Sequence, residues 1–227
     1  LRSVFRRRLL AGVGAASLIA VGANFGGVTS FLLGFSPEAA RGLKLDAVYP
    51  VGGFTRYVDA GEGFEFVYPE SWLGDQTLLY RSAGKAERSL DLPPLSGGAI
   101  IRKKINEPVV AFGPPASTGE VNVSVIVSPV SSDLSTESSG GEEVVRRAVA
   151  GRGKGTVKAW NVRVDGKGVR YYVVEFVVET TPGFRRHNVA VWCTRKGKLF
   201  TLNAQAPESA WPQFQHRFDA IAHSFNL

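Results

Sequence analysis

Three consecutive segments near the C-terminal end, residues 169–180, 184–195 and 198–206, have the length and the alternation of β-strands. Residues 181–183 and 196–197, which link them, are of hairpin length. Strands joined by such short links pair antiparallel, because a parallel pair needs a crossover of about a dozen residues. The chain must therefore contain an antiparallel sheet. In VRYYVVEFVVET, the first segment, one face carries Tyr172, Val174, Phe176 and Val178.

Two further patterns extend this sheet. FTRYVD (54–59) and FEFVYP (64–69) flank the glycine-containing turn AGEG, which predicts another hairpin. The segment EVNVSVIVSPV (120–130) alternates apolar with polar residues and predicts a strand with one buried face. That face carries Val121, Val123, Val125 and Val127.

Helices are fewer. GEEVVRRAVAG (141–151) is a short amphipathic pattern that ends in glycine. In the last segment Ser209 is the expected N-cap, and Pro212 falls in the first turn, where proline is tolerated. An apolar stripe follows at steps of three and four: Trp211, Phe214, Phe218, Ile221 and Phe225. Residues 54–227 are therefore predicted to fold as one α+β domain, an antiparallel sheet flanked by helices.

The net charge of +7 does not indicate a nucleic-acid-binding surface. Residues 1–44 hold six basic groups and one acid, whereas the remaining residues hold 21 basic and 19 acidic groups. Most of the positive charge thus lies outside the predicted domain. With 227 residues and 44% hydrophobic side chains the chain can bury a core, and a single cysteine, Cys193, excludes an internal disulfide. Cys193 is expected to be a packed, unreactive thiol on a strand.

The N-terminal segment is apolar and follows a run of arginines. No charged residue occurs between Leu9 and Phe35, a length sufficient to span a bilayer as a helix. Arg6 and Arg7, followed by leucines, resemble a twin-arginine translocation signal. Residues 1–40 are therefore predicted to be either a cleaved signal or a retained membrane anchor, in both cases with one hydrophobic helix, and 41–53 a linker.

No catalytic motif is apparent, and the chain is predicted not to be an enzyme. GRGKGT (151–156) departs from a phosphate-binding loop, because Gly155 stands where serine or threonine is needed, and it predicts a flexible basic turn. His216 and His223 are seven residues apart on the last helix, not at a spacing of three or four that would suit a metal. No metal-ligand set and no cofactor site is evident.

Several motifs, in their order along the chain, resemble the PsbP family of thylakoid-lumen proteins: GFTRYVDAGEGFEFVYPESW, VNVSVIVSPV, RYYVVEFVVET and HNVAVWCTRKGKLFTLNAQAPESAW. The resemblance runs from about Tyr49 to Leu227. It implies an αβα sandwich around an antiparallel sheet, carried on the lumenal side of the chloroplast thylakoid. In the family's founding subunit an acid before the last tryptophan comes close to a histidine at the start of the preceding strand. Glu208 and His187 occupy those positions, so the resemblance implies that they form a structural pair.

The resemblance also implies binding to photosystem subunits rather than catalysis. The expected role is that of an auxiliary or assembly factor for photosystem II or photosystem I. Two alternatives remain open: an extrinsic subunit of the oxygen-evolving complex that supports calcium and chloride retention, and a subunit of the thylakoid NAD(P)H dehydrogenase-like complex. Calcium is implied by the family alone. A small-ligand or enzymatic role would need a polar pocket with converging titratable groups, none of which is evident in the sequence, and a deep cleft lined by His187 and Glu208 would favour that role.

Basic side chains are the expected contacts to such a partner, because basic groups speed encounter with an acidic surface. For any single residue, a solvated surface position is the more common role. The candidate partner-binding residues, in addition to the segment 41–53, are Arg102, Lys103, Lys104, Arg185, Arg186 and His187.

Overall fold

A computed structural model describes most of the chain: residues 12–14, 16–19, 21–75, 107–116, 119–130, 154–181 and 184–227. The described residues belong to two compact units. The first unit holds those up to Val58 together with Val67–Glu70, and the second holds Asp59–Phe66 together with those from Ser71 to Leu227.

The first unit contains short helices. Described residues between 12 and 22 are helical, and a turn at Asn24 then leads into further short elements. Asn24, Gly26 and Gly27 have positive φ values of 50°, 62° and 75°, a backbone region that glycine adopts readily and that interrupts a helix. The helices that follow are η1 (Phe25–Gly27), α2 (Val28–Gly34), α3 (Pro37–Gly42) and η2 (Leu45–Ala47). Among the described residues, none of the helices combines the length and apolarity needed to cross a membrane.

A buried ion pair ties the segment 41–53 to the first strand of the chain. Asp46 in η2 is buried, and its two carboxylate oxygens each accept a hydrogen bond of 2.8 Å from the guanidinium of Arg56. Such a bidentate pair fixes orientation as well as distance. Val51 is also buried. Part of the predicted linker is therefore packed inside the first unit.

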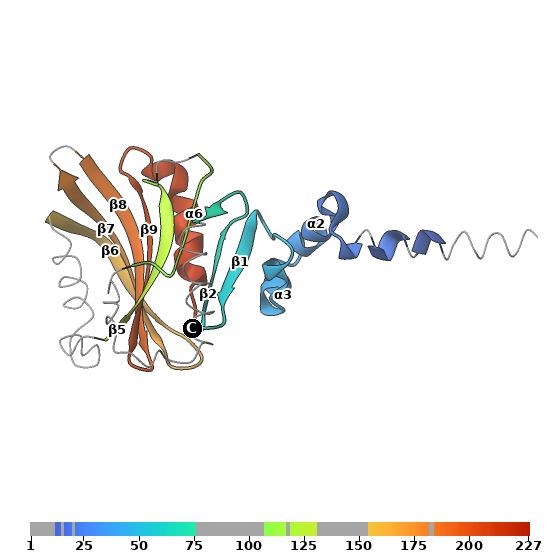
Figure 1. Cartoon of the computed structure of the whole chain (residues 1–227), viewed down its shortest axis with the longest axis horizontal. Helices are drawn as coiled ribbons and strands as arrows, with labels where there is room; N and C mark the ends of the chain where they lie inside the picture. Colours follow the sequence, from blue (N-terminus) through green and yellow to red (C-terminus); the bar gives the residue numbers. More distant parts are fainter. Residues whose placement is uncertain are drawn as a thin grey trace, which may run out of the picture. The chain divides into compact units, whose positions relative to one another are not determined.

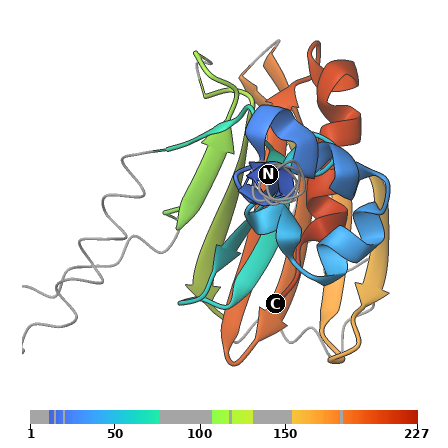
Figure 2. The ribbon, with the colours of Figure 1, turned by 90° about the vertical axis from the view of Figure 1, so that its right-hand side faces the viewer.

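The second unit is built on one seven-stranded antiparallel sheet with the order β3-β4-β5-β9-β8-β7-β6 (Figure 1). In Figure 2 the green strands β4 and β5 lie toward one side of the sheet and the light-orange strand β6 toward the other. The strands β1 (Phe54–Asp59) and β2 (Phe64–Pro69) form a separate two-stranded sheet. The large sheet consists of β3 (Leu73–Gly74), β4 (Val110–Gly113), β5 (Asn122–Pro129), β6 (Lys154–Val164), β7 (Arg170–Thr181), β8 (Phe184–Arg195) and β9 (Lys198–Pro207).

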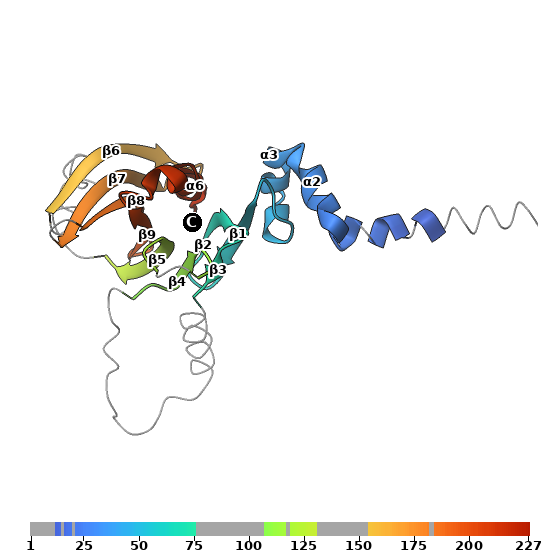
Figure 3. The ribbon, with the colours of Figure 1, turned by 90° about the horizontal axis from the view of Figure 1, so that it is seen from above.

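One long helix, α6 (Trp211–Ser224), packs on β8 and β9 and covers one face of the sheet, here called the helix face (Figure 3). The apolar stripe predicted for this segment supplies that contact, since Trp211, Phe218 and Ile221 are buried. Pro212 lies in the first turn as predicted, but the predicted N-cap is wrong. The N-cap is Ala210, which has no side-chain oxygen to cap the helix, so backbone hydrogen bonds of the preceding corner hold this end.

The opposite face of the sheet, here called the far face, has its own apolar cluster. Side chains of β7 and β8 form it, with Phe176 and Trp192 stacked at 6.4 Å between ring centroids. Its buried members are Tyr172, Val174, Phe176, Val178, Ala190 and Trp192. The helix predicted over 141–151 lies outside the described residues. Both faces of β7 are thus buried, as expected for a central strand of a layered α+β fold.

The predicted α+β fold agrees with this architecture, but the sequence patterns do not predict every strand of the sheet. The flexible turn predicted over 151–156 is wrong where it can be tested, because Lys154, Gly155 and Thr156 begin the strand β6. The short strands β3 and β4 were not predicted either. Residues 84–108 combine charges, two adjacent prolines and paired glycines without a sustained period, which predicts a long loop, but apart from residues 107 and 108 they lie outside the described residues.

Candidate functional site

The corner between β9 and α6 brings together polar groups from three elements of the second unit. Strand β9 ends at Pro207, and the next backbone N–H, that of Glu208, donates to the carbonyl of Arg185 on β8 at 3.0 Å. The N–H of Ala210 then donates to the carbonyl of Pro207 at 2.9 Å, and α6 begins with Trp211. The corner therefore holds Glu208 and Trp211 beside the start of β8.

His187 on β8 lies at the centre of this group. Its ring is parallel to that of Trp211, with 3.7 Å between ring centroids and 1° between the planes. Nδ1 lies 3.0 Å from Oε2 of Glu208, and Nε2 lies 2.7 Å from Oε1 of Glu175 on β7. Only 5% of His187 is exposed. We call these four residues, Glu175, His187, Glu208 and Trp211, the His187 cluster.

The geometry suits a doubly protonated imidazole ring. An ionised carboxylate only accepts hydrogen bonds, whereas a neutral imidazole donates from one nitrogen alone. Both His187 contacts are therefore hydrogen bonds to ionised carboxylates only when each ring nitrogen carries a proton. A cationic ring also gains from the indole face of Trp211. The cluster thus places the imidazole ring between two carboxyl groups beneath the first turn of α6.

A third acid lies near the cluster on α6. Burial raises the pKa of the Asp219 carboxyl, and the like charge of Glu175 raises that pKa further, while His223 and His216 act in the opposite direction. Asp219 also accepts through its backbone carbonyl a hydrogen bond of 2.7 Å from Nδ1 of His223. Glu175 therefore acts on the Asp219 carboxyl through its charge as well as on His187 through its direct contact.

The His187 ring is enclosed by the protein. Each ring nitrogen of His187 is held by a carboxylate, one ring face is covered by Trp211, and the residue is buried. A general base must reach the proton that it removes. No such approach is open to the His187 ring, so the arrangement ties β7, β8 and α6 together. In the described part of the chain, no group of three or more His, Cys, Asp or Glu side chains is placed to hold a metal ion.

The predicted site residues fall in three different environments. Arg102, Lys103 and Lys104 lie outside the described residues. Arg185 is exposed and Arg186 is half-buried. Strand alternation turns Arg186 toward the far face, away from His187. The structure thus separates the predicted basic patch: His187 lies inside the protein, and Arg185 remains as its exposed neighbour.

Cys193 lies on the helix face of β8 and is buried. Burial raises the pKa of its thiol to about 12, and the nearby Arg163 guanidinium only partly offsets this. A thiol with so little thiolate at neutral pH is a poor nucleophile. This environment matches that of a packed, unreactive cysteine.

A hollow of about 670 Å³ lies elsewhere in the second unit, against β3, β4 and β5. Polar side chains in its wall include Asp75, Glu107, Ser124 and Gln205. Neither His187 nor Glu208 lines it. This hollow is therefore not a deep cleft lined by His187 and Glu208, the arrangement that would favour a small-ligand role.

Sequence reasoning missed Glu175 and the stack on Trp211. Glu175 lies on a face of β7 between Val173 and Val177, which are both buried, whereas the other acid of that face, Glu179, is exposed. A carboxylate in such a row needs a partner, because burying an unpaired charge is costly. That signal was available, but the identity of the partner depends on strand register.

Comparisons with known proteins agree on one family. The PsbP family model matches residues 52–227. The chain is 57% identical to PsbP domain-containing protein 7, chloroplastic, of Arabidopsis thaliana, over 98% of this chain and 83% of that protein. It is 30% identical to CyanoP of Thermosynechococcus vestitus over 77% of this chain and 86% of that protein.

A solved structure shows the same fold. The solution structure of cyanobacterial PsbP, or CyanoP, from Synechocystis sp. matches 79% of this chain and 95% of that chain with a TM-score of 0.53 at 25% sequence identity. The predicted α+β fold is thereby confirmed. Because the family model covers most of the chain and the relatives span most of their own lengths, the chain belongs to the PsbP family.

Proposed function

We propose that this protein is a non-enzymatic auxiliary or assembly factor of the chloroplast thylakoid lumen that docks on photosystem II or photosystem I. The similarity to a chloroplastic PsbP-domain protein of Arabidopsis thaliana and to CyanoP supports a photosynthetic setting. The protein then acts by docking through its surface and not by catalysing a reaction.

The enclosure of the His187 ring is the main observation that supports a non-enzymatic role. Catalytic acids and bases need contact with a substrate, whereas every polar atom of the His187 ring is bound within the protein. The cluster instead stabilises the corner where β9 meets α6. The surface around that corner, including exposed Arg185, is left for a partner.

Basic groups supply the proposed contacts. We assign docking to Arg102, Lys103 and Lys104, to Arg185 and Arg186, and to the segment 41–53. His187 supports the Arg185 region from inside rather than touching a partner, because it is buried. Basic residues of this kind raise the rate of encounter with an acidic surface more than they raise affinity.

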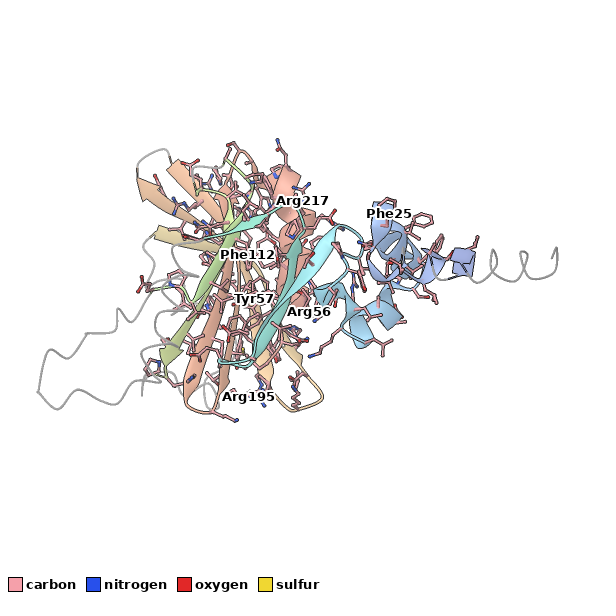
Figure 4. All side chains as sticks on the ribbon, turned by 45° about the vertical axis from the view of Figure 1, so that its right-hand side comes forward. Phe25, Arg56, Tyr57, Phe112, Arg195 and Arg217 are labelled. Carbon is pink, nitrogen blue, oxygen red and sulfur yellow. The ribbon has the colours of Figure 1, made fainter. Side chains whose placement is uncertain are left out.

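The test is co-purification of the tagged full chain with membrane complexes from washed thylakoids. Replacing Arg102, Lys103 and Lys104 together by glutamine should reduce recovery of the complex, and the effect should shrink at high salt, where charges are screened. A matched control replaces Arg195, Lys196 and Arg217, of which Arg195 and Arg217 are marked in Figure 4. Equal recovery with both triple variants would contradict the assigned docking contacts.

A second candidate, the extrinsic photosystem II subunit with a role in calcium and chloride retention, rests on the family resemblance, as does a subunit role in the NAD(P)H dehydrogenase-like complex. Loss of an assembly factor lowers accumulation of a complex. Loss of the extrinsic subunit lowers oxygen evolution in a way that added calcium restores. Measuring both in plants that lack the protein separates these roles, and an intact photosystem content with a depleted dehydrogenase complex would favour the third.

A further inference from the structure

In the described part of the chain, β6 is an outer strand of the large sheet. β6 is the last strand in the sheet order, so no described strand pairs with its outer side (Figure 3). Alternate residues of an edge strand direct their N–H and C=O groups away from the sheet, where they can pair with another strand. From Lys158 to Val162 the residues are exposed. This backbone is therefore accessible.

The open strand carries an apolar row. Trp160, Val162 and Val164 are 43%, 40% and 60% exposed. Trp160 and Val162 lie opposite Val174 and Tyr172 of β7, and residues directly opposite in an antiparallel pair share a face. The row is therefore an exposed continuation of the buried cluster on the far face. A strand added beside β6 would extend this apolar surface.

The open stretch has defined ends. The register of the pairing between β6 and β7 shifts between Val157 and Ala159, so Lys158 is the extra residue of a β-bulge. Bulges and lysines on an edge strand hinder pairing with other chains. At the other end the chain turns at Asp165. The regular stretch between them, Ala159–Val164, is here called the open edge, and it has the length of an ordinary strand contact.

Arg163 faces the helix side and is used internally. Its guanidinium lies 4.0 Å from the ring centroid of Tyr171, and it donates to Asn226 at 3.2 Å and to the carbonyl of Phe225. These contacts hold β6 against the C-terminal residues. The open edge is thus a rigid strand rather than a frayed one.

The charge around the open edge indicates which kind of strand can bind there. Residues 154–170 hold five basic residues and one acid, Asp165. The Asp165 carboxylate accepts bonds from the N–H groups of Lys167 and Val169 at 2.8 and 2.9 Å and from the Tyr171 hydroxyl at 3.0 Å. Lys158 and Arg170 are exposed at the two ends. With five basic residues against one acid over residues 154–170, a strand that carries acidic side chains is the charge-complementary occupant.

We propose that the open edge binds an extended acidic segment of a partner protein by β-strand addition, with apolar side chains of the segment beside Trp160, Val162 and Val164. Main-chain hydrogen bonds supply affinity in this mode, and alternate side chains supply specificity. The inference rests on the proposed docking function for its partner, but the binding property belongs to β6 itself and is tested separately.

The test is titration of the full chain with a short peptide of blocked ends in which valine and glutamate alternate, followed by amide NMR shifts and tryptophan fluorescence. The shifts should concentrate on the open edge. Val162→Lys should weaken binding about tenfold, which corresponds to 1.4 kcal/mol. Val58→Lys, at a residue 47% exposed on β1, is the matched control and should bind as the unchanged chain does.

Three results overturn the proposal: shifts outside β6, equal binding of a peptide with lysine in place of glutamate, or unchanged binding by the Val162→Lys protein. Reversing charge with Lys158→Glu and Arg170→Glu provides a second test, because it should invert the preference between the two peptides while leaving the core intact. Binding of vesicles rich in anionic lipid, lost in Val162→Lys while the acidic peptide fails to bind, would assign the edge to a membrane surface and also overturn the proposal.

Co-purification separates this inference from the proposed function. If the Val162→Lys protein neither binds the peptide nor co-purifies with the complex, the docking function and the binding by the open edge are both supported. If this variant no longer binds the peptide but still co-purifies with the complex, the docking function is supported, and the open edge is not the surface that contacts the complex. If the unchanged chain recovers no complex, the docking function fails, and the peptide titration alone decides what β6 binds.

Discussion

His187 on β8 and the open edge on β6 belong to the same sheet, with only β7 between the two strands, but the tryptophans of the two regions differ in exposure. Trp211 is 6% exposed and stacked on His187, whereas Trp160 is 43% exposed on the outer strand. At the first site each ring nitrogen of His187 has a partner inside the protein. At the second, backbone groups and apolar side chains face outward. The contrast indicates that the corner stabilises the fold and the edge is available for binding.

The largest expected difference between the two regions lies in their tryptophans. Trp211→Ala should lower the free energy of unfolding by about 3–5 kcal/mol, because it removes a large buried side chain and leaves a cavity beside His187 and Phe218. Trp160→Ala should cost less than about 1 kcal/mol, because that side chain is already partly in water. Urea unfolding of both variants checks this.

Phenylalanine variants refine the comparison. Trp211→Phe should recover part of the loss, since a ring can still lie over His187, while Trp160→Phe should match the unchanged chain. Similar losses in both alanine variants would show that the open edge contributes to stability, and the division between a stabilising corner and a binding edge would then be wrong.

The next effect concerns the two carboxylate contacts of His187. His187→Ala should cost about 2–3 kcal/mol, since hydrogen bonds to charged groups are worth more than neutral ones but Glu175 and Glu208 are partly exposed. Glu208→Ala should cost about 1 kcal/mol. A double-mutant cycle on His187 and Glu208 measures their coupling directly. A coupling energy of zero would mean that the contact of 3.0 Å contributes nothing to the stability of the corner.

Much of the fold could be predicted because alternation is a local property of the sequence. The strand patterns at 54–59, 64–69 and 184–195 coincide with β1, β2 and β8. β6 was missed since its glycine-containing start resembles a turn and its apolar residues are exposed. An exposed edge strand has no buried face to impose a strong pattern.

The site could be predicted only in part, because it depends on register. The resemblance to the PsbP family pointed to the pair of His187 and Glu208, and the structure places them 3.0 Å apart. Glu175 reaches the other ring nitrogen through the pairing of β7 with β8, whose register shifts between Glu179 and Thr181. A shift of one residue would turn Glu175 to the opposite face. No composition or spacing argument fixes that shift.

A third prediction uses alkaline pH to test the anchoring of β6. Burial raises the pKa of Tyr171 to about 12, and its hydrogen bond to Asp165 adds to that rise. Because the folded state holds this proton more tightly than the unfolded chain, the contribution to stability is complete below the ordinary tyrosine pKa of 10.0 and is lost as pH rises toward 12. The loss should reach about 1–2 kcal/mol.

Tyr171→Phe tests this assignment. The variant keeps the ring beneath Arg163 but removes the hydroxyl that donates to Asp165 and accepts from the N–H of Leu227 at 3.0 Å. It should be less stable than the unchanged chain at pH 8, and the gap should narrow by pH 11 in urea unfolding. A gap that stays constant with pH would assign the alkaline loss to other groups.

The smallest effect is expected at Asp219, at the margin of the His187 cluster. Because burial and the charge of Glu175 raise its pKa above the ordinary 3.8, the folded state binds this proton more tightly and stability falls as pH rises through the raised pKa. Asp219→Asn should therefore stabilise the protein at pH 7 by about a few tenths of a kcal/mol, reduced by solvent screening at this partly exposed position. At pH 3, where both states are protonated, the difference should vanish. Glu179→Gln, which removes an exposed acid from the same strand as Glu175, is the matched control. If Asp219→Asn instead destabilises the protein at neutral pH, then the ionised carboxylate is favourable there through His216 and His223, and the excess of acids does not extend beyond the two partners of His187.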